Sequence, residues 1–208
     1  TKVGSGTLTL SGANTYSGGT TISSGQLTLS GLGSLGSTAN DLTLSNSATL
    51  DLQKSLTVRN LLMSSSNAIV NNGGISVLTV NGTSTLAGSI NTTSTQTYAG
   101  VVQLGADTTL TTSNGAVLFS STIDNSSSTP RTLTVSTGNG NVTLSGIVGG
   151  GVNGGLGAIT VNSTGTTTFG STVNADSVTT NTGGTVYLGG NVTTTGAQTY
   201  NDAVSLTG

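Results

Sequence analysis

Short apolar runs in which one threonine separates two aliphatic residues recur along the chain. Each run places the aliphatic side chains on one face of an extended segment and the threonine on the other, which is the two-residue period of a half-buried β-strand. Threonine is also β-branched and favours a pleated surface. The pattern predicts strands at residues 8–10, 27–29, 42–44, 56–58, 78–80, 133–135, 142–144 and 159–161. No window has the apolar spacing of an amphipathic helix, so essentially no helix is expected.

Clusters of glycine, asparagine and serine separate these runs, for example at residues 71–74 and 137–140. Both Gly and Asn tolerate positive φ, so the backbone can turn sharply there. Short strands joined by such corners fit a sandwich, a barrel or a solenoid. The recurring strand unit, and core positions that hold small aliphatic residues rather than aromatic rings, favour the solenoid. At roughly 20 to 25 residues per coil, the chain would form an all-β solenoid of about nine coils.

A longer repeat supports the same architecture. The segment that begins at Gln96 reads Gln-Thr-Tyr-x-x-x-Val-x-Leu, and the segment that begins at Gln198 reads the same, with an offset of 102 residues. Such an offset would correspond to four or five coils. Self-similarity of this kind is typical of units that stack only on their neighbours. We therefore interpret residues 1–208 as a single solenoid segment that is part of a longer repeat array.

The composition excludes several classes of partner. Only 5% of the residues are charged, against about 25% in average proteins. Nucleic-acid binding is not expected, because no basic patch could neutralise phosphates. The chain has no polybasic stretch, and its apolar runs are only a few residues long, so this segment is not expected to insert into a membrane. Without Cys there is no disulfide framework and no thiolate metal site.

The catalytic inventory is equally small. Polysaccharide cleavage needs paired carboxylates, or a carboxylate beside a Lys or Arg. The nearest candidates are Asp41 and Asp51, together with Lys54 and Arg59, and the chain has no His, Cys or Glu. We interpret this cluster as a solvated face near one end of the molecule. The chain is not expected to be an enzyme, and we assign it no catalytic, cofactor-binding or metal-binding residue.

The glycine-rich stretch 149–157 is predicted to be a protruding loop. It lacks the Lys-Ser/Thr pair of a phosphate-binding loop, and no predicted helix follows it. No Asp lies in a Gly-Gly run, so calcium binding of the β-roll type is not expected either.

Three tyrosines share an Asn/Gln-Thr-Tyr context, namely Tyr16, Tyr98 and Tyr200. Rings repeated along a rod could stack on sugars. Alternatively, each ring could pack against the coil below and leave its hydroxyl in water. We favour the structural role.

Residues 7–29 resemble the autotransporter-associated β-strand repeat, and Gly12 to Ile22 (Gly-Ala-Asn-Thr-Tyr-Ser-Gly-Gly-Thr-Thr-Ile) carry its recognisable core. More loosely, residues 95–208 resemble the Thr/Gly/Asn-rich repeats of haemagglutinin-like bacterial surface adhesins. The resemblance implies a right-handed parallel β-helix, exported and displayed outside a bacterial cell. It does not identify a ligand.

These observations lead to one functional expectation and two alternatives. The expectation is a non-enzymatic structural rod, extracellular or on the bacterial cell surface, that serves as the stalk or passenger segment of an adhesin or as part of a surface fibre. One alternative is a carbohydrate-binding solenoid that uses the three tyrosines. The other is a filament subunit that associates end to end. A host or matrix glycan or protein is a candidate partner whose identity stays open.

Overall fold

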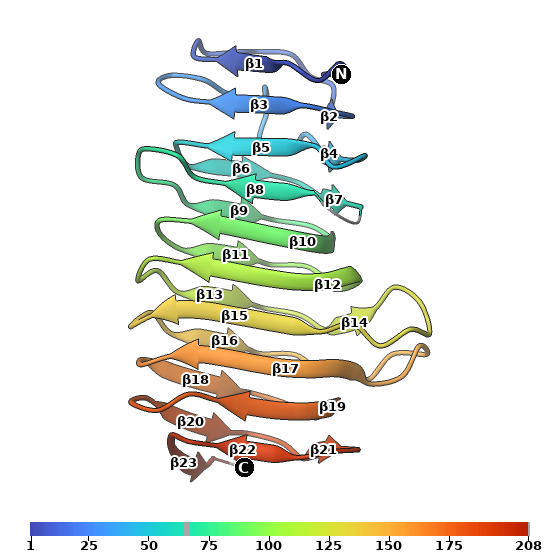
Figure 1. The fold of residues 1–208 in the computed structure, drawn as a ribbon, viewed down its shortest axis with the longest axis vertical. Coiled ribbons are helices and arrows are strands. Elements are labelled where there is room, and N and C mark those ends of the chain that lie inside the picture. Colours follow the sequence, from blue (N-terminus) through green and yellow to red (C-terminus); the bar gives the residue numbers. More distant parts are fainter. Residues whose placement is uncertain (65–66, 208) are drawn as a thin grey trace.

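The computed structural model describes residues 1–64 and 67–207. These residues contain 23 short strands and no helix. All pairings between the strands are parallel, and the strands that pair are separated in sequence by strands of the other sides. Each coil therefore lies on the coil before it, as a β-solenoid does (Figure 1). The predicted fold class is confirmed.

The coil has three sides, which we call faces 1, 2 and 3 in the order in which the chain visits them. Face 1 holds β2 (Thr20–Ile22), β4 (Leu42–Leu44), β7 (Leu61–Met63), β14 (Ile123–Asn125) and β21 (Val192–Thr194), together with the first residues of the long strands β10 (Ser84–Thr92), β12 (Val102–Thr112) and β19 (Val173–Thr180).

Face 2 holds the later residues of the same three long strands. It also holds β1 (Thr7–Leu10), β3 (Gln26–Leu29), β5 (Thr49–Leu52), β8 (Ala68–Val70), β15 (Leu133–Gly138), β17 (Leu156–Ser163) and β22 (Gln198–Tyr200). Because β10, β12 and β19 cross the corner, faces 1 and 2 form one sheet of 15 strands.

Face 3 is a separate sheet of eight strands. Its members are β6 (Leu56–Val58), β9 (Leu78–Val80), β11 (Gln96–Tyr98), β13 (Val117–Phe119), β16 (Val142–Leu144), β18 (Thr166–Phe169), β20 (Thr185–Leu188) and β23 (Ala203–Leu206). In Figure 1 the front strands run from right to left, the fainter strands behind run from left to right, and the chain descends from the N-terminus. The coil is therefore right-handed.

The described residues form about ten coils, one more than predicted. The strand order of the large sheet, from β1 to β21, contains ten strands, one from each coil. The length of a coil varies. Leu27 pairs with Leu8, 19 residues earlier, whereas Val161 pairs with Val135, 26 residues earlier. All eight predicted strand triplets lie within strands of the structure. The additional strands are mostly polar segments in which the apolar alternation is weak.

Aliphatic side chains from the three faces meet in a continuous central core. On face 2 the inward residues stack directly above one another, and all of them are at most 2% exposed; the column is Leu27, Leu50, Ile69, Ile90, Leu110, Val135 and Val161. Burial of each such side chain contributes about 1.5 to 3 kcal/mol. The core has no break between successive coils, so stability accrues along the whole rod.

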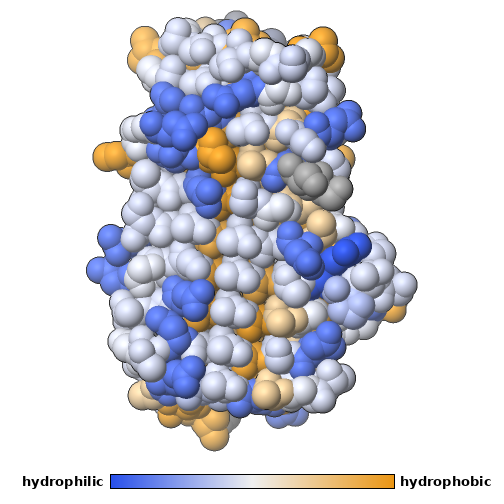
Figure 2. Space-filling view, in the orientation of Figure 1, coloured by the Kyte–Doolittle hydropathy of each residue, from blue (hydrophilic) through white to orange (hydrophobic). Residues whose placement is uncertain are grey.

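Outward positions form matching columns of small polar residues. On face 2 the registers align Ser89, Thr109, Thr134, Thr160, Thr179 and Thr199. Face 3 begins with a similar column at Thr57, Thr79 and Thr97. Figure 2 shows the result as a surface of mostly intermediate hydropathy with scattered hydrophilic groups. The outside of the rod is hydrated with few charges.

Asparagine side chains close the corners by bonding the backbone of a neighbouring coil. The clearest case is Asn67, which is 2% exposed: its amide nitrogen donates to Leu44 O at 2.7 Å, and its oxygen accepts from Ala48 N at 2.9 Å. Corners leave backbone N–H and C=O groups outside the strand ladders, and a buried amide satisfies both kinds.

One corner lies inside a strand. Gly88 in β10 has φ of 77°, and a Cβ there would collide with the Asn67 carbonyl oxygen. The register with β12 shifts between Leu86 and Gly88. Only glycine fits this position, because it needs both a left-handed backbone and close contact with the coil above.

Candidate functional site

Tyr98 is a core residue. Its side chain is fully buried, and its ring stacks on Phe119 of the next coil with a centroid distance of 5.1 Å. Its hydroxyl donates to Gln96 Oε1 at 3.0 Å. Burial raises the pKa of the Tyr98 hydroxyl far above its usual value. The expected packing against the next coil is confirmed, but the expectation that the hydroxyl stays in water is wrong. In this fold Tyr98 cannot contact a glycan.

Gln96 explains how this hydroxyl is accommodated. It is fully buried, and its amide nitrogen donates to Ile90 O at 3.1 Å and to Thr111 O at 3.0 Å. The first carbonyl belongs to the same coil and the second to the next one. Gln96 therefore ties two coils together from inside the core, with its own oxygen left for Tyr98.

Tyr200 repeats the local geometry in the last coil. Its hydroxyl donates to Gln198 Oε1 at 3.1 Å, and Gln198 Nε2 donates to Val192 O at 3.0 Å. Both hydrogen bonds join residues with the same sequence separation as the corresponding bonds of Tyr98 and Gln96. Gln198, however, is exposed, and Tyr200 is only partly buried. Partial burial raises the pKa of Tyr200 above its usual value.

The two copies lie on different sides of the rod. Tyr98 pairs with Val80 and Phe119 on face 3, whereas Tyr200 pairs with Thr180 on face 2. The offset of 102 residues is therefore not a whole number of coils. The repeated unit consists of a strand, a corner and the next strand. The first copy forms the corner between faces 3 and 1, and the second copy forms the corner between faces 2 and 3.

Tyr16 has a third environment. It lies between β1 and β2, is 38% exposed, and its hydroxyl is 2.6 Å from Thr20 Oγ1. Nearby, Asn14 Nδ2 donates to Ser34 O at 2.9 Å, and Asn40 Nδ2 donates to Tyr16 O at 3.1 Å. The three tyrosines thus do not form a row along the rod, which is the arrangement that the carbohydrate-binding alternative would need.

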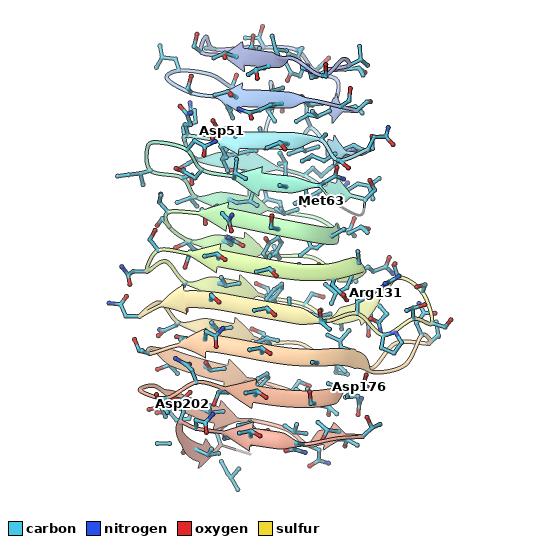
Figure 3. The ribbon with its side chains drawn as sticks, in the orientation of Figure 1. Asp51, Met63, Arg131, Asp176 and Asp202 are labelled. Carbon is cyan, nitrogen blue, oxygen red and sulfur yellow. The ribbon has the colours of Figure 1, made fainter. Side chains whose placement is uncertain are left out.

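The predicted acid–base cluster is divided between two faces. Asp41 precedes β4 on face 1, where Arg59 donates to its two oxygens at 2.8 Å each. The hydrogen bonds and charge of Arg59 hold the pKa of Asp41 below its usual range. Asp51 lies on β5 of face 2, is 2% exposed and accepts from Gln53 (Figure 3). Lys54 lies on the connection to face 3. The structure brings Asp41 and Arg59 together, and it does not pair the two carboxylates.

Two loops project from the side of the rod, on the right of Figure 1. The first, residues 126–132, joins β14 to β15, and the second, residues 149–155, precedes β17. The predicted loop at 149–157 is thus confirmed except for its last two residues, which begin β17. The first loop was missed, although it contains the chain's one proline, Pro130. We call the two loops together the knob.

Two side chains at the end of β14 fasten the knob. Asn125 is 1% exposed; its amide nitrogen donates to Gly155 O at 2.8 Å, and its oxygen accepts from Arg131 N at 2.9 Å. Asp124 Oδ1 accepts from Gly151 N at 2.7 Å. Each loop is therefore hydrogen-bonded to the same strand, which gives the knob a defined shape.

A groove of about 260 Å³ lies beside the knob, on the side toward β19 and β21. Figure 3 labels Asp176, one of its lining residues, below the projecting loops. Sequence reasoning missed this groove, since its residues come from four successive coils. Its lining includes Pro130, Asn153, Asn174, Asp176, Thr193 and Thr195.

Residues 1–31 match the family model of the passenger-associated-transport-repeat. The match covers β1, β2 and β3, and it contains the stretch from Gly12 to Ile22 on which the resemblance rests. With the parallel solenoid, it fits an autotransporter passenger repeat, and hence a secreted or surface-exposed protein. No curated protein and no solved structure matches the chain.

The described residues contain no group of three or more His, Cys, Asp or Glu side chains placed to hold a metal ion. No helix among them is long and apolar enough to cross a bilayer.

Proposed function

We propose that this chain is a non-enzymatic structural rod, the stalk segment of an autotransporter passenger that serves a surface adhesin. The observation that carries the proposal is the uninterrupted parallel stacking of strands through about ten coils. Each inner coil is paired above and below, so nearly all of its backbone groups are satisfied within the ladder. At a rise near 4.8 Å per coil, the rod is on the order of 45 Å long.

The surface supports the same role. The outward columns of Thr and Ser stay hydrated while the net charge is only −2. A nearly uncharged rod neither attracts nor repels most surfaces, which suits a spacer that holds a binding element away from a cell. The uniformity of the core also means that length can change by whole coils without loss of fold.

A deletion series tests this modular role. Ile69 and Ile90 stack in register, so removal of residues 69–89 excises one coil and joins equivalent positions. We expect this variant to fold with an unchanged β-type circular dichroism spectrum and to be shorter by about 4.8 Å in small-angle scattering.

The matched control removes residues 69–79. This shorter deletion shifts the later strands to the wrong faces and turns outward threonines into the core, so it should fail to fold cooperatively. If both variants fold equally well, or if the intact chain is a compact particle rather than a rod, the proposal is wrong.

A further inference from the structure

The knob and its groove lie on one side of the rod. The five residues from Ser126 to Pro130 are all exposed, and Val152 in the second loop is fully exposed. The mechanical role of a rod does not need these loops. Their shape is nevertheless specified, because the buried Asn125 bonds both of them. A structured loop pair on a rigid scaffold is a common location for a binding site.

The groove combines one apolar surface with several hydrogen-bonding groups. The Pro130 ring contributes a flat apolar side. Thr193 and Thr195 contribute hydroxyls, and Asn153 and Asn174 contribute side-chain amides. The amide nitrogens already donate to Asn125 O and Gly149 O, so the amide oxygens are the groups left to accept from a ligand. Binding pockets for small molecules usually have this make-up, with a few placed polar groups in a mainly apolar lining.

Asp176 supplies a carboxylate of which one oxygen accepts no hydrogen bond from the described residues. Thr195 Oγ1 is 3.2 Å from Asp176 Oδ1, and among the described residues nothing donates to Oδ2. A free carboxylate oxygen accepts hydroxyl groups strongly, because charge-assisted hydrogen bonds are about twice as strong as neutral ones.

A second groove on face 1 provides an internal comparison. It measures about 250 Å³ and also contains an Asp, an Asn and threonines, namely Asp41, Asn60, Thr83 and Thr85. There, however, Arg59 occupies both oxygens of Asp41, and Asn60 Nδ2 donates to Oδ1 at 2.9 Å. Both carboxylate oxygens of this groove are already used within the protein. In the Asp176 groove only Oδ1 has a partner, the Thr195 hydroxyl, and Oδ2 is open among the described residues.

The charge of the lining limits the ligand. The lining residues described include no Lys or Arg, so an anionic ligand has no counter-ion and would be repelled by Asp176. A single carboxylate without a second one nearby is a poor site for a divalent cation. A ligand with several neutral hydroxyls and an apolar C–H face fits both the polar groups and the proline.

From these features we propose that the groove beside the knob binds one neutral sugar unit of a glycan. Asp176 accepts hydroxyl protons, the amides of Asn153 and Asn174 bond further hydroxyls, and the C–H face of the sugar packs on Pro130. This site replaces the three tyrosines as the carbohydrate contact. Sugar binding at this groove and the mechanical role of the rod are separate proposals, and either can fail without the other.

The test is a titration of the intact, isotope-labelled chain with glucose, galactose, mannose and N-acetylglucosamine, followed by amide chemical shifts. At least one sugar should shift the signals of residues 153, 174 and 193–195, with a dissociation constant of roughly millimolar order. Asp176→Ala should weaken binding about tenfold or more, because it removes a charged hydrogen-bond acceptor. Thr193→Arg should abolish binding by filling the groove.

Asp41→Ala is the matched control, since it changes the same residue type in the groove of similar size. This variant should bind the sugar as the parent chain does. The proposal is overturned if none of the four sugars shifts the groove signals, or if Asp176→Ala binds unchanged. It is also overturned if sialic acid or Ca²⁺ alone produces the shifts. The circular dichroism spectrum of each variant monitors the fold, so loss of the sugar site is distinguishable from failure of the rod.

Discussion

The Gln-Thr-Tyr segment at residues 96–98 and its copy at residues 198–200 form the same local structure in two different surroundings. In both, the Tyr hydroxyl donates to the Gln oxygen, and the Gln nitrogen donates to a carbonyl six residues earlier. Within the described residues, which end at 207, only the first copy is covered by a further coil, and this coil adds Thr111 O as an acceptor and Phe119 as a stacking partner. The comparison separates what the segment encodes locally from what its neighbours add.

The neighbouring coil changes the character of the residues. Gln96 and Tyr98 are completely buried, whereas Gln198 is exposed and Tyr200 is partly buried. The same tripeptide, Gln-Thr-Tyr, therefore forms a buried hydrogen-bond network in one coil and a partly exposed one in another. The contribution of each copy to stability should differ accordingly, and this can be measured.

Truncation of the two rings should give the largest contrast. Tyr98→Ala leaves a cavity beside Phe119 and should lower the free energy of unfolding by about 3 to 5 kcal/mol. Tyr200→Ala removes a ring with no coil beneath it and should cost about 1 kcal/mol. Urea denaturation of both variants measures the difference. Equal losses would mean that the cover of the next coil contributes nothing.

Truncation of the two glutamines should give a smaller contrast. Gln96→Ala leaves the Tyr98 hydroxyl without its partner and removes the Gln96 bonds to Ile90 O and Thr111 O inside the core, so it should cost about 1 to 3 kcal/mol. Gln198→Ala exposes its former partners to water, so its effect should stay within about 0.5 kcal/mol. A large loss in the second variant would show that the local network, rather than burial, stabilises the motif.

Alkaline pH should reveal the smallest of the three contrasts. Burial raises the pKa of Tyr98 above the value near 10 that it has in the unfolded chain. The resulting contribution to the free energy of unfolding is therefore complete below about pH 10 and is lost as the pH rises above it. The slope approaches about 1.4 kcal/mol per pH unit, because only the unfolded chain releases this proton. The pKa of Tyr200 is also raised by burial. Because Tyr200 is only partly buried, we expect its hydroxyl to ionise in the folded protein.

Phenolate absorbance checks this difference. Under alkaline conditions in which the protein stays folded, Tyr98→Phe should leave the phenolate signal unchanged, and Tyr200→Phe should reduce it. A reduced signal in folded Tyr98→Phe would contradict the burial of this hydroxyl.

Strand positions were predictable because their cause is local. The alternation of Leu, Thr and Val within three residues indicates which side chains point inward, and every such triplet lies in a strand. Segments such as β11 and β22 were harder to recognise, because their inward residues are Gln and Tyr. The protruding loop at 149–155 was predictable from its glycines, whereas the loop at 126–132 was not separated from other polar turns.

The amino-acid sequence alone determined that the chain is all-β, coiled and almost uncharged, and it located most of the strands. The tertiary structure decided which of the three faces each strand occupies, and hence that Tyr98 is buried, that Asp41 and Asp51 are apart, and that a groove forms beside the knob. The physical reason is that side-chain alternation depends on neighbouring residues. The face that a strand occupies depends on the summed lengths of all the preceding corners, and burial depends on the coil that follows.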